Sequence, residues 1–273
     1  MDEPIVSIDD FERIARSKLP PEVFDYYAGG AGREWTLRAN LAAFDKWILR
    51  PRVLVGVADR DASTEVLGSR VSFPVLVAPW AFQSRADPDG EVATARAAAR
   101  AGTIMVLSAT ASHRLDDVAK ASNAPKWFQL YMYGDRGFSK EALLRAYELG
   151  FGAVVFTVDV PVLGKRDRDR RNELEMPIEG PGQELDFDPS ITWDDLAWLR
   201  QAYDEPEENG LTPLRDTAAV AAWEPDQACA AGLVLADAGG EDGDEDEIVD
   251  AEHDLERGER DKRGPRMRIR KQR

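Results

Sequence analysis

The chain has 273 residues and a mass of 30.3 kDa, which is enough for one α/β domain of ordinary size or two small ones. It carries 51 acidic against 35 basic residues, a formal net charge of −16, and this balance argues against binding to a nucleic-acid backbone. The single cysteine, Cys229, excludes a disulfide framework and a multi-cysteine metal site. No apolar run approaches the roughly 18 residues of a membrane span, and the first residues lack a secretory signal. We therefore expect a cytoplasmic protein without nucleic-acid, metal or membrane partners.

The first 203 residues alternate between helical and extended patterns. Two helices are expected at 9–17 and 21–28. Four apolar, β-branched runs then predict strands of a buried parallel sheet, at 75–78, 104–108, 127–131 and 153–159. Further helices are expected at 91–101, 115–121, 140–149 (opened by Ser139 as its N-cap) and 193–201. Successive βα units favour an open doubly wound sheet or a (β/α)8 barrel, and the missing G-x-G-x-x-G motif argues against a dinucleotide-binding fold.

The composition changes after residue 203. Of the 23 aromatic residues, 21 lie before residue 201, and residues 237–256 hold 11 Asp and Glu but no Lys or Arg. Blocks of like charge with few aromatic side chains cannot bury enough apolar surface to offset the entropy of ordering. We therefore predict a folded part over 1–203 and a disordered acidic and basic tail over 204–273, with a short helix around 216–223.

Polar side chains end the predicted strands, where parallel α/β folds gather their functional residues. The residues at these ends are Pro79, Trp80 and Ala81 after the first strand, Ser108 in the second, Gln129 and Tyr131 in the third, and Thr157 and Asp159 in the fourth. A buried polar group needs a hydrogen-bonding partner, so four such ends indicate a binding site at this edge of the sheet. The alternative is that each side chain caps its own strand and bonds to the nearby loop backbone.

Several short motifs make the chain recognisable. They are Phe-Asp-Tyr-Tyr-Ala-Gly-Gly-Ala at 24–31, Thr-Leu-Arg-Ala-Asn at 36–40, Phe-Gln-Leu-Tyr at 128–131, Thr-Val-Asp-Val-Pro at 157–161, Gly-Lys-Arg at 164–166 and Ile-Thr-Trp-Asp-Asp-Leu-Ala-Trp-Leu at 191–199. In this order they resemble the N-terminal half of the FMN-dependent 2-hydroxy-acid oxidases and dehydrogenases, the family of glycolate oxidase, lactate oxidase and mandelate dehydrogenase. The resemblance covers residues from about 8 to 200.

The resemblance implies a fold, a cofactor and a reaction. The family has a (β/α)8 TIM barrel that holds FMN at its mouth and oxidises a small (S)-2-hydroxy acid to the 2-oxo acid. For this chain it implies the first four βα units with the N-terminal helices ahead of them, followed by the charged tail. A homo-oligomer is also expected, because members of the family often assemble.

The resemblance also assigns roles to individual residues. Cofactor contacts are expected from Pro79, Trp80, Ala81, Ser108, Gln129 and Thr157, and substrate contacts from Tyr26, Tyr131 and Arg166. Tyr131 and Asp159 match catalytic positions, Asp159 as the aspartate that orients the histidine base of the family. Taken without the resemblance, Tyr26 is an aromatic cover at a helix end, Arg166 is part of a solvated mixed-charge loop, and Asp159 caps a loop.

The histidine base of the family has no counterpart in the expected pattern. The only histidines are His113, which we expect to be a surface residue at a helix start, and His253, which lies in the acidic run. The later segments that hold the FMN phosphate also have no match after about residue 199. We therefore expect a truncated or frameshifted coding sequence and a sheet whose first and fourth strands are unpaired edges. Activity is expected to be impaired or lost; the alternatives are a non-catalytic fragment or interaction module, and another FMN barrel such as an isomerase.

Overall fold

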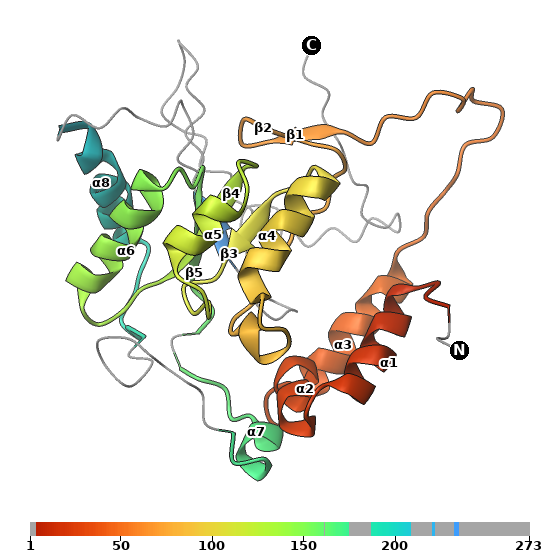
Figure 1. Ribbon diagram of the computed structural model, residues 1–273, viewed down its shortest axis with the longest axis horizontal. Coiled ribbons are helices and arrows are strands. Elements are labelled where there is room, and N and C mark those ends of the chain that lie inside the picture. Colours follow the sequence, from red (N-terminus) through yellow and green to blue (C-terminus); the bar gives the residue numbers. More distant parts are fainter. Residues whose placement is uncertain (1–3, 161, 175–186, 209–219, 222–231, 235–273) are drawn as a thin grey trace, which may run out of the picture. The chain divides into compact units, whose positions relative to one another are not determined.

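The computed structural model describes residues 4–160, 162–174, 187–208, 220–221 and 232–234 (Figure 1). By its internal contacts the chain divides into residues 1–238 and 239–273, and all the described residues belong to the first unit. None of the helices in the described part combines the length and the apolar character needed to cross a lipid bilayer.

Three parallel strands form the centre of the described structure. Strands β3 (Met105–Leu107), β4 (Lys126–Tyr131) and β5 (Val154–Thr157) lie side by side in chain order. Nearly all their side chains are buried, as expected for a parallel sheet that is covered on both faces. The structure confirms three of the four predicted strands and the α/β character of the chain, with strand ends displaced by one or two residues.

The first predicted strand is reduced to one bridge. Val77 pairs in parallel with Met105, and its backbone N–H donates to the carbonyl oxygen of Ile104 at 2.9 Å. The apolar run is flanked by Pro74 and Pro79, which have no N–H to donate to a neighbouring strand. The prediction of a strand over 75–78 was therefore wrong in its length, although the segment holds the first position of the parallel order.

Helices follow the strands as expected for βα units. They are α4 (Gly90–Ala101), α5 (Leu115–Ala121) and α6 (Arg136–Glu148). Helix α6 begins earlier than predicted, because the Asp135 carboxylate, and not Ser139, accepts from the first free amides, that of Gly137 at 2.8 Å among them. Ser139 is buried inside the helix, where its Oγ accepts from the N–H of Tyr133 at 3.1 Å.

The sheet separates two groups of core side chains. One face carries Met105, Leu107, Phe128, Leu130 and Phe156, which pack with residues of the helices, among them Leu143. The opposite face carries Val106, Trp127 and Val155, which pack with Val71 and Ile104. Because strand side chains alternate between faces, Ser108, Gln129 and Thr157 extend this second row toward the carboxyl ends of the strands.

The N-terminal part is mainly helical. Helices α1 (Ile8–Lys18) and α2 (Pro21–Ala28) confirm the two predicted helices. A third helix, α3 (Trp35–Ala43), and the one-turn helix η1 (Phe44–Lys46) follow them. A short antiparallel hairpin of β1 (Thr64–Val66) and β2 (Ser69–Val71) then precedes the sheet. The sequence patterns had predicted neither α3 nor the hairpin.

Three further helices lie in the connections. They are the one-turn helix η2 (Gln83–Arg85), the short α7 (Asp167–Arg171) after β5, and α8 (Asp194–Glu208). Helix α8 covers the predicted 193–201 helix and continues beyond it, across the expected end of the folded part at residue 203.

Two short strands come from the C-terminal region. Strand β7 (Gly232–Val234) pairs antiparallel with β5, and β6 (Val220–Ala221) pairs with β7. The order of the sheet is therefore β3-β4-β5-β7-β6, and the prediction that the fourth strand is an unpaired edge was wrong. The helix predicted around 216–223 is contradicted at Val220–Ala221 and otherwise lies outside the described residues, as does most of the predicted disordered tail.

Candidate functional site

The three strand side chains that are predicted to contact the cofactor lie in one hydrogen-bonded row. The side-chain amide of Gln129 donates to Thr157 Oγ1 at 2.9 Å, and its carbonyl oxygen accepts from Ser108 Oγ at 3.3 Å and from the N–H of Ala109 at 3.1 Å. Gln129 is only 1% exposed, and Ser108 and Thr157 are buried as well. The structure thus brings together residues that are separated by up to 49 positions in the sequence, 108 to 157. They lie at the carboxyl ends of the strands, on the sheet face that also carries Val106, Trp127 and Val155.

The segment after Val77 lies beside the loop that follows β3. The N–H of Phe82 donates to the carbonyl oxygen of Thr110 at 3.2 Å, and the Gln83 side chain donates to the carbonyl oxygen of Trp80 at 3.2 Å. Phe82 has a positive φ of 54°, which a non-glycine residue adopts only when its surroundings hold it there. The loop that contains Pro79, Trp80 and Ala81 is therefore tied to the end of β3, next to Ser108.

A buried carboxylate, Glu91, joins these two loops. It is 0% exposed and accepts from the N–H of Gln83 at 3.0 Å, from the N–H of Ser112 at 2.9 Å and from the ring Nδ1 of His113 at 2.8 Å. Burial alone raises the pKa of Glu91, but the hydrogen bonds from His113 and from the backbone outweigh it and lower that pKa. His113 is thus the partner of a buried anion. Its side chain, just ahead of α5, is 25% exposed; the sequence predicted a surface histidine there but not this partner.

The aromatic end of helix α2 packs against the Trp80–Phe82 loop. The hydroxyl of Tyr27 donates to the carbonyl oxygen of Phe82 at 2.6 Å, and its ring meets the Trp80 ring edge to face at 4.8 Å. The ring of Tyr26 lies 6.2 Å from that of Phe82. Burial raises the pKa of Tyr27 to about 12, and it also raises the pKa of Tyr26. Both phenols are therefore neutral hydrogen-bonding groups at pH 7.

Tyr131 ends β4 beside Asp159. Burial, and after it the negative charge of Asp159, raises the pKa of Tyr131 to about 12. The same pKa responds to Tyr26, so these three predicted residues lie within electrostatic reach of one another. The Tyr131 ring also packs on Phe187 at 4.4 Å between centroids. Two predicted substrate tyrosines and the predicted catalytic aspartate therefore share one region.

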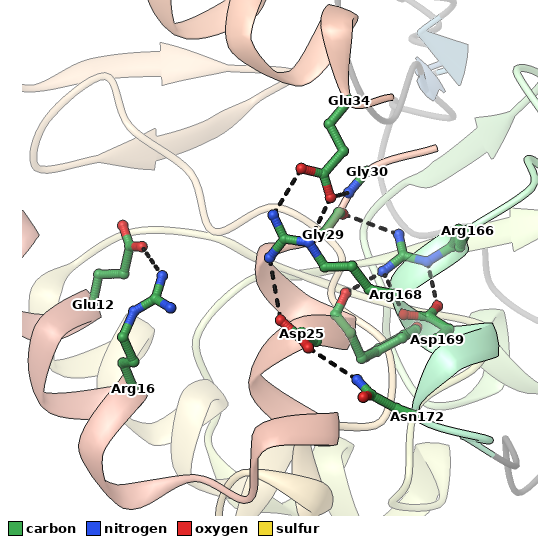
Figure 2. A network of polar contacts seen from close by, with 11 residues as sticks. Glu12, Arg16, Asp25, Gly29, Gly30, Glu34, Arg166, Arg168, Asp169 and Asn172 are labelled. Carbon is green, nitrogen blue, oxygen red and sulfur yellow. Dashed lines mark hydrogen bonds and ion pairs between the residues drawn. The ribbon is translucent and has the colours of Figure 1, made fainter. Parts of the chain in front are cut away.

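Arg166 reaches this region from the segment before α7, and all its nitrogens are engaged within the chain. Its guanidinium pairs with the Asp169 carboxylate along one edge, and along the other edge it donates to the carbonyl oxygen of Gly29 at 3.2 Å (Figure 2). The same edge also donates to the carbonyl oxygen of Tyr26. It also lies over the Tyr26 ring, 5.1 Å from the centroid. A two-bonded grip on a substrate carboxylate requires one free edge, so in this arrangement that predicted role needs one of these contacts to be released.

Known structures place this architecture in a class of enzymes. A mandelate oxidase structure aligns with a TM-score of 0.69 and 37% identity over 74% of this chain and 61% of that chain. A soluble mutant of the membrane-associated (S)-mandelate dehydrogenase from Pseudomonas putida aligns with a TM-score of 0.69 and 33% identity, over 73% and 62% of the two chains. The parallel strands described above thus belong to a TIM-barrel fold of the 2-hydroxy-acid oxidases, of which they form a part.

Sequence comparison gives the family. Residues 15–207 match the family described as FMN-dependent dehydrogenase, and the chain belongs to this family. It is 43% identical over 222 residues to L-lactate oxidase from Nostoc sp., and 40% identical over 221 residues to glycolate oxidase from Spinacia oleracea. These alignments cover 71% and 72% of this chain but only 61% and 59% of the relatives. The chain thus spans about three fifths of their length, and the resemblance seen in its motifs is confirmed.

The donor set of the strand row fits the ring of the family's cofactor. Its three side chains are neutral, buried hydroxyl and amide groups that both donate and accept. The polar edge of a flavin ring is also uncharged and alternates acceptors and donors, so such a row can hold it without burying a net charge. Ser108, Gln129 and Thr157 are the residues that would hold the ring, next to the backbone of Pro79, Trp80 and Ala81.

Proposed function

We propose that this chain carries part of the active site of an FMN-dependent (S)-2-hydroxy-acid oxidoreductase. This part comprises the residues that bind the flavin ring and the tyrosines that contact the substrate. The observation that supports this most strongly is the buried Ser108–Gln129–Thr157 row at the carboxyl ends of three parallel strands. Such strand ends are where α/β barrels place their chemistry. The relatives that resemble the chain are oxidases and dehydrogenases, which favours this chemistry over isomerisation.

Each residue has a distinct task in the proposal. Bound FMN supplies the acceptor for the two electrons and the hydrogen that leave C2 of the hydroxy acid. Tyr131, whose pKa of about 12 keeps its hydroxyl protonated at neutral pH, donates a hydrogen bond to a substrate oxygen. Tyr26 provides a second phenol from α2, and the Asp159 carboxylate supplies the negative charge that holds a proton-accepting group in position.

The proton-accepting group itself limits the activity that we propose. Of the two histidines, the ring of His113 is hydrogen-bonded to Glu91, and His253 lies outside the described residues. General base catalysis contributes roughly 10²- to 10⁴-fold to typical enzyme rates. We therefore propose that turnover of lactate or glycolate by this chain is impaired or lost; purification of a flavin-loaded monomer that turns over either acid would contradict this.

An FMN titration tests the role of the strand row. We expect weak binding of added FMN, and we expect Gln129→Leu to lower the affinity about tenfold, because removing one hydrogen-bonding side chain costs about 1.4 kcal/mol. Gln201→Leu, which changes an exposed glutamine of α8, is the matched control and should leave the affinity unchanged. Equal affinities for the Gln129 and Gln201 variants would refute the proposal.

A second candidate, an interaction module, is favoured by an exposed apolar segment between α3 and β1. Its exposed large side chains are Phe44, Trp47, Ile48, Leu49, Val53, Leu54, Val55 and Val57. Large apolar side chains that gather on the surface are typical of protein interfaces, and this one segment exposes eight of them. The occupant we propose is a polypeptide that supplies further barrel strands. Sedimentation of the purified chain as a complex with such a partner would favour this function, whereas a stable monomer would argue against it.

The cytoplasmic localisation and the homo-oligomeric state of the chain stay predictions.

A further inference from the structure

The short helix α7 holds the N-terminal helices through a second arginine, Arg168. Its guanidinium bonds to both carboxylate oxygens of Glu34, with Nε at 2.6 Å from Oε1 and Nη2 at 2.7 Å from Oε2. Its remaining nitrogen, Nη1, lies 3.2 Å from Asp25 Oδ1. Figure 2 shows that one arginine thereby links the side chains on both sides of the Gly29–Gly30 turn, which follows α2. We call Arg168, Asp25 and Glu34 the arginine clasp.

Further contacts attach the same turn to the segment around α7. The side-chain amide of Asn172 donates to Asp25 Oδ2 at 2.9 Å, and the N–H of Gly32 donates to the carbonyl oxygen of Lys165 at 2.7 Å. Arg166 donates to the main-chain carbonyl of Tyr26. The carboxyl end of α2 is thus held both through its side chains and through its backbone, by residues that lie about 140 positions away in the sequence.

Two backbone features indicate that the clasp is a built arrangement. Glu34 has a positive φ of 56°, a conformation that costs a non-glycine residue of the order of 1 kcal/mol or more, and Arg168 grips its side chain there. A Cβ placed on Gly29 would lie 2.5 Å from the carbonyl oxygen of Asp25 and 3.3 Å from Cδ of Arg168. Position 29 therefore requires glycine, mainly because of the Asp25 carbonyl oxygen, and Arg168 packs closely against it.

The electrostatics agree with this geometry. The hydrogen bond from Arg168 lowers the pKa of Glu34, and the hydrogen bond from Asn172, with that from Arg168 after it, lowers the pKa of Asp25. Both carboxylates are therefore charged at neutral pH, and the two negative charges share a single guanidinium. Removing that guanidinium leaves the two anions, which lie nine positions apart in the sequence, without the cation that they share.

We propose that Arg168 is a positioning residue: by holding Asp25 and Glu34 it fixes the last turn of α2, and with it the ring of Tyr26, on the substrate side of the site. Tyr26 directly follows Asp25 in α2, and its ring already contacts Tyr27 and Phe82 at centroid distances of 5.2 and 6.2 Å. The consequence for substrate binding rests on the proposed function, but the effect on the Tyr26 ring does not. The mixed-charge segment around α7 is then a docking element for α2 instead of a solvated loop.

The test labels the chain with 3-fluorotyrosine and follows the fluorine resonance of Tyr26, which Tyr26→Phe identifies. Arg168→Met removes the charge at nearly constant length and should shift or broaden this resonance. It should also speed hydrogen exchange of the amides of residues 24–30 at least tenfold. Arg145→Met is the matched control, because Arg145 also pairs with two carboxylates, Asp116 and Glu148, on the surface of α5 and α6.

Rescue separates positioning from a general loss of stability. Arg168→Lys keeps the charge but lacks the planar fork that holds Glu34 through two nitrogens, so it should return the Tyr26 resonance part of the way toward its original position. Should Arg168→Met unfold the chain, Arg168→Lys and Glu34→Gln carry the same test with smaller perturbations. A Tyr26 resonance and an exchange rate that respond equally to the Arg168 and Arg145 variants would overturn the proposal. Neither readout uses FMN or turnover. The experiment therefore tests the role of Arg168 even if the proposed function proves wrong.

Discussion

Replacing Glu91 by Gln should destabilise the chain far more than an isosteric surface change. Glu91 accepts two hydrogen bonds on each carboxylate oxygen: one oxygen serves Gln83 and Ser112, and the other serves the backbone N–H and the ring of His113. A glutamine keeps the first oxygen but turns an NH₂ group toward the His113 N–H. The hydrogen bond between the carboxylate and the His113 ring is lost, which costs about 1.5–3 kcal/mol. The backbone N–H of His113 also loses its acceptor, which costs about 1–3 kcal/mol. We expect a loss of about 3 kcal/mol in the free energy of unfolding.

Urea unfolding followed by tryptophan fluorescence at pH 7 measures this loss. Glu148→Gln is the control, because Glu148 makes an exposed ion pair with Arg145 one turn away and such pairs contribute roughly 0–1 kcal/mol. The lowered pKa of Glu91 also fixes the pH dependence. Its stabilisation is fully present above the unfolded-state pKa of about 4.3, and it is lost as pH falls through the lower folded-state value. Glu91→Gln should remove that part of the acid sensitivity. Equal losses for the two variants at pH 7 would mean that the hydrogen bonds of Glu91 stabilise the chain no more than a surface ion pair does.

Two further variants test the packing that supports the site. Gly102→Ala should lower the free energy of unfolding by about 1–3 kcal/mol, because Gly102 has a φ of +68° and an added Cβ would lie 2.2 Å from Ser72 Oγ. Thermal unfolding checks this, with Gly56→Ala as the control, because an added Cβ at Gly56 meets nothing within 4 Å. Leu143→Ala should cost about 2–5 kcal/mol, because Leu143 is a residue of α6 that is 0% exposed and packs with the strand side chains. A loss below about 1 kcal/mol in urea unfolding would mean that α6 does not cover the sheet as described.

The strands were predictable because their signal is local. Apolar runs without polar interruption gave β3, β4 and β5 within two residues, since a parallel sheet buries both faces. Local competition explains the errors. Prolines shorten the first strand to Val77, and Asp135 takes the N-cap role that the sequence also offered to Ser139. Helix α3 was missed because its N-cap, Glu34, adopts a left-handed conformation that is not a usual helix signal.

The site was predictable only where its residues end strands. Ser108, Gln129 and Thr157 stood out as polar groups in apolar runs, and the register of the sheet brings them together. Glu91 offered a weaker signal, a charge beside apolar positions at the start of a helix, and nothing local named His113 as its partner. Arg168 offered none, because its partners Asp25 and Glu34 lie more than 130 residues away.

The side-chain amide of Gln129 should report whether the strand row binds the flavin ring. Its two ¹⁵N–¹H resonances can be assigned in the full chain by their disappearance in Gln129→Leu. We predict that millimolar FMN shifts these resonances and leaves those of the exposed Gln201 side chain in place. FMN-induced changes that spare Gln129, or none at all, would contradict a flavin-ring site on the strand row.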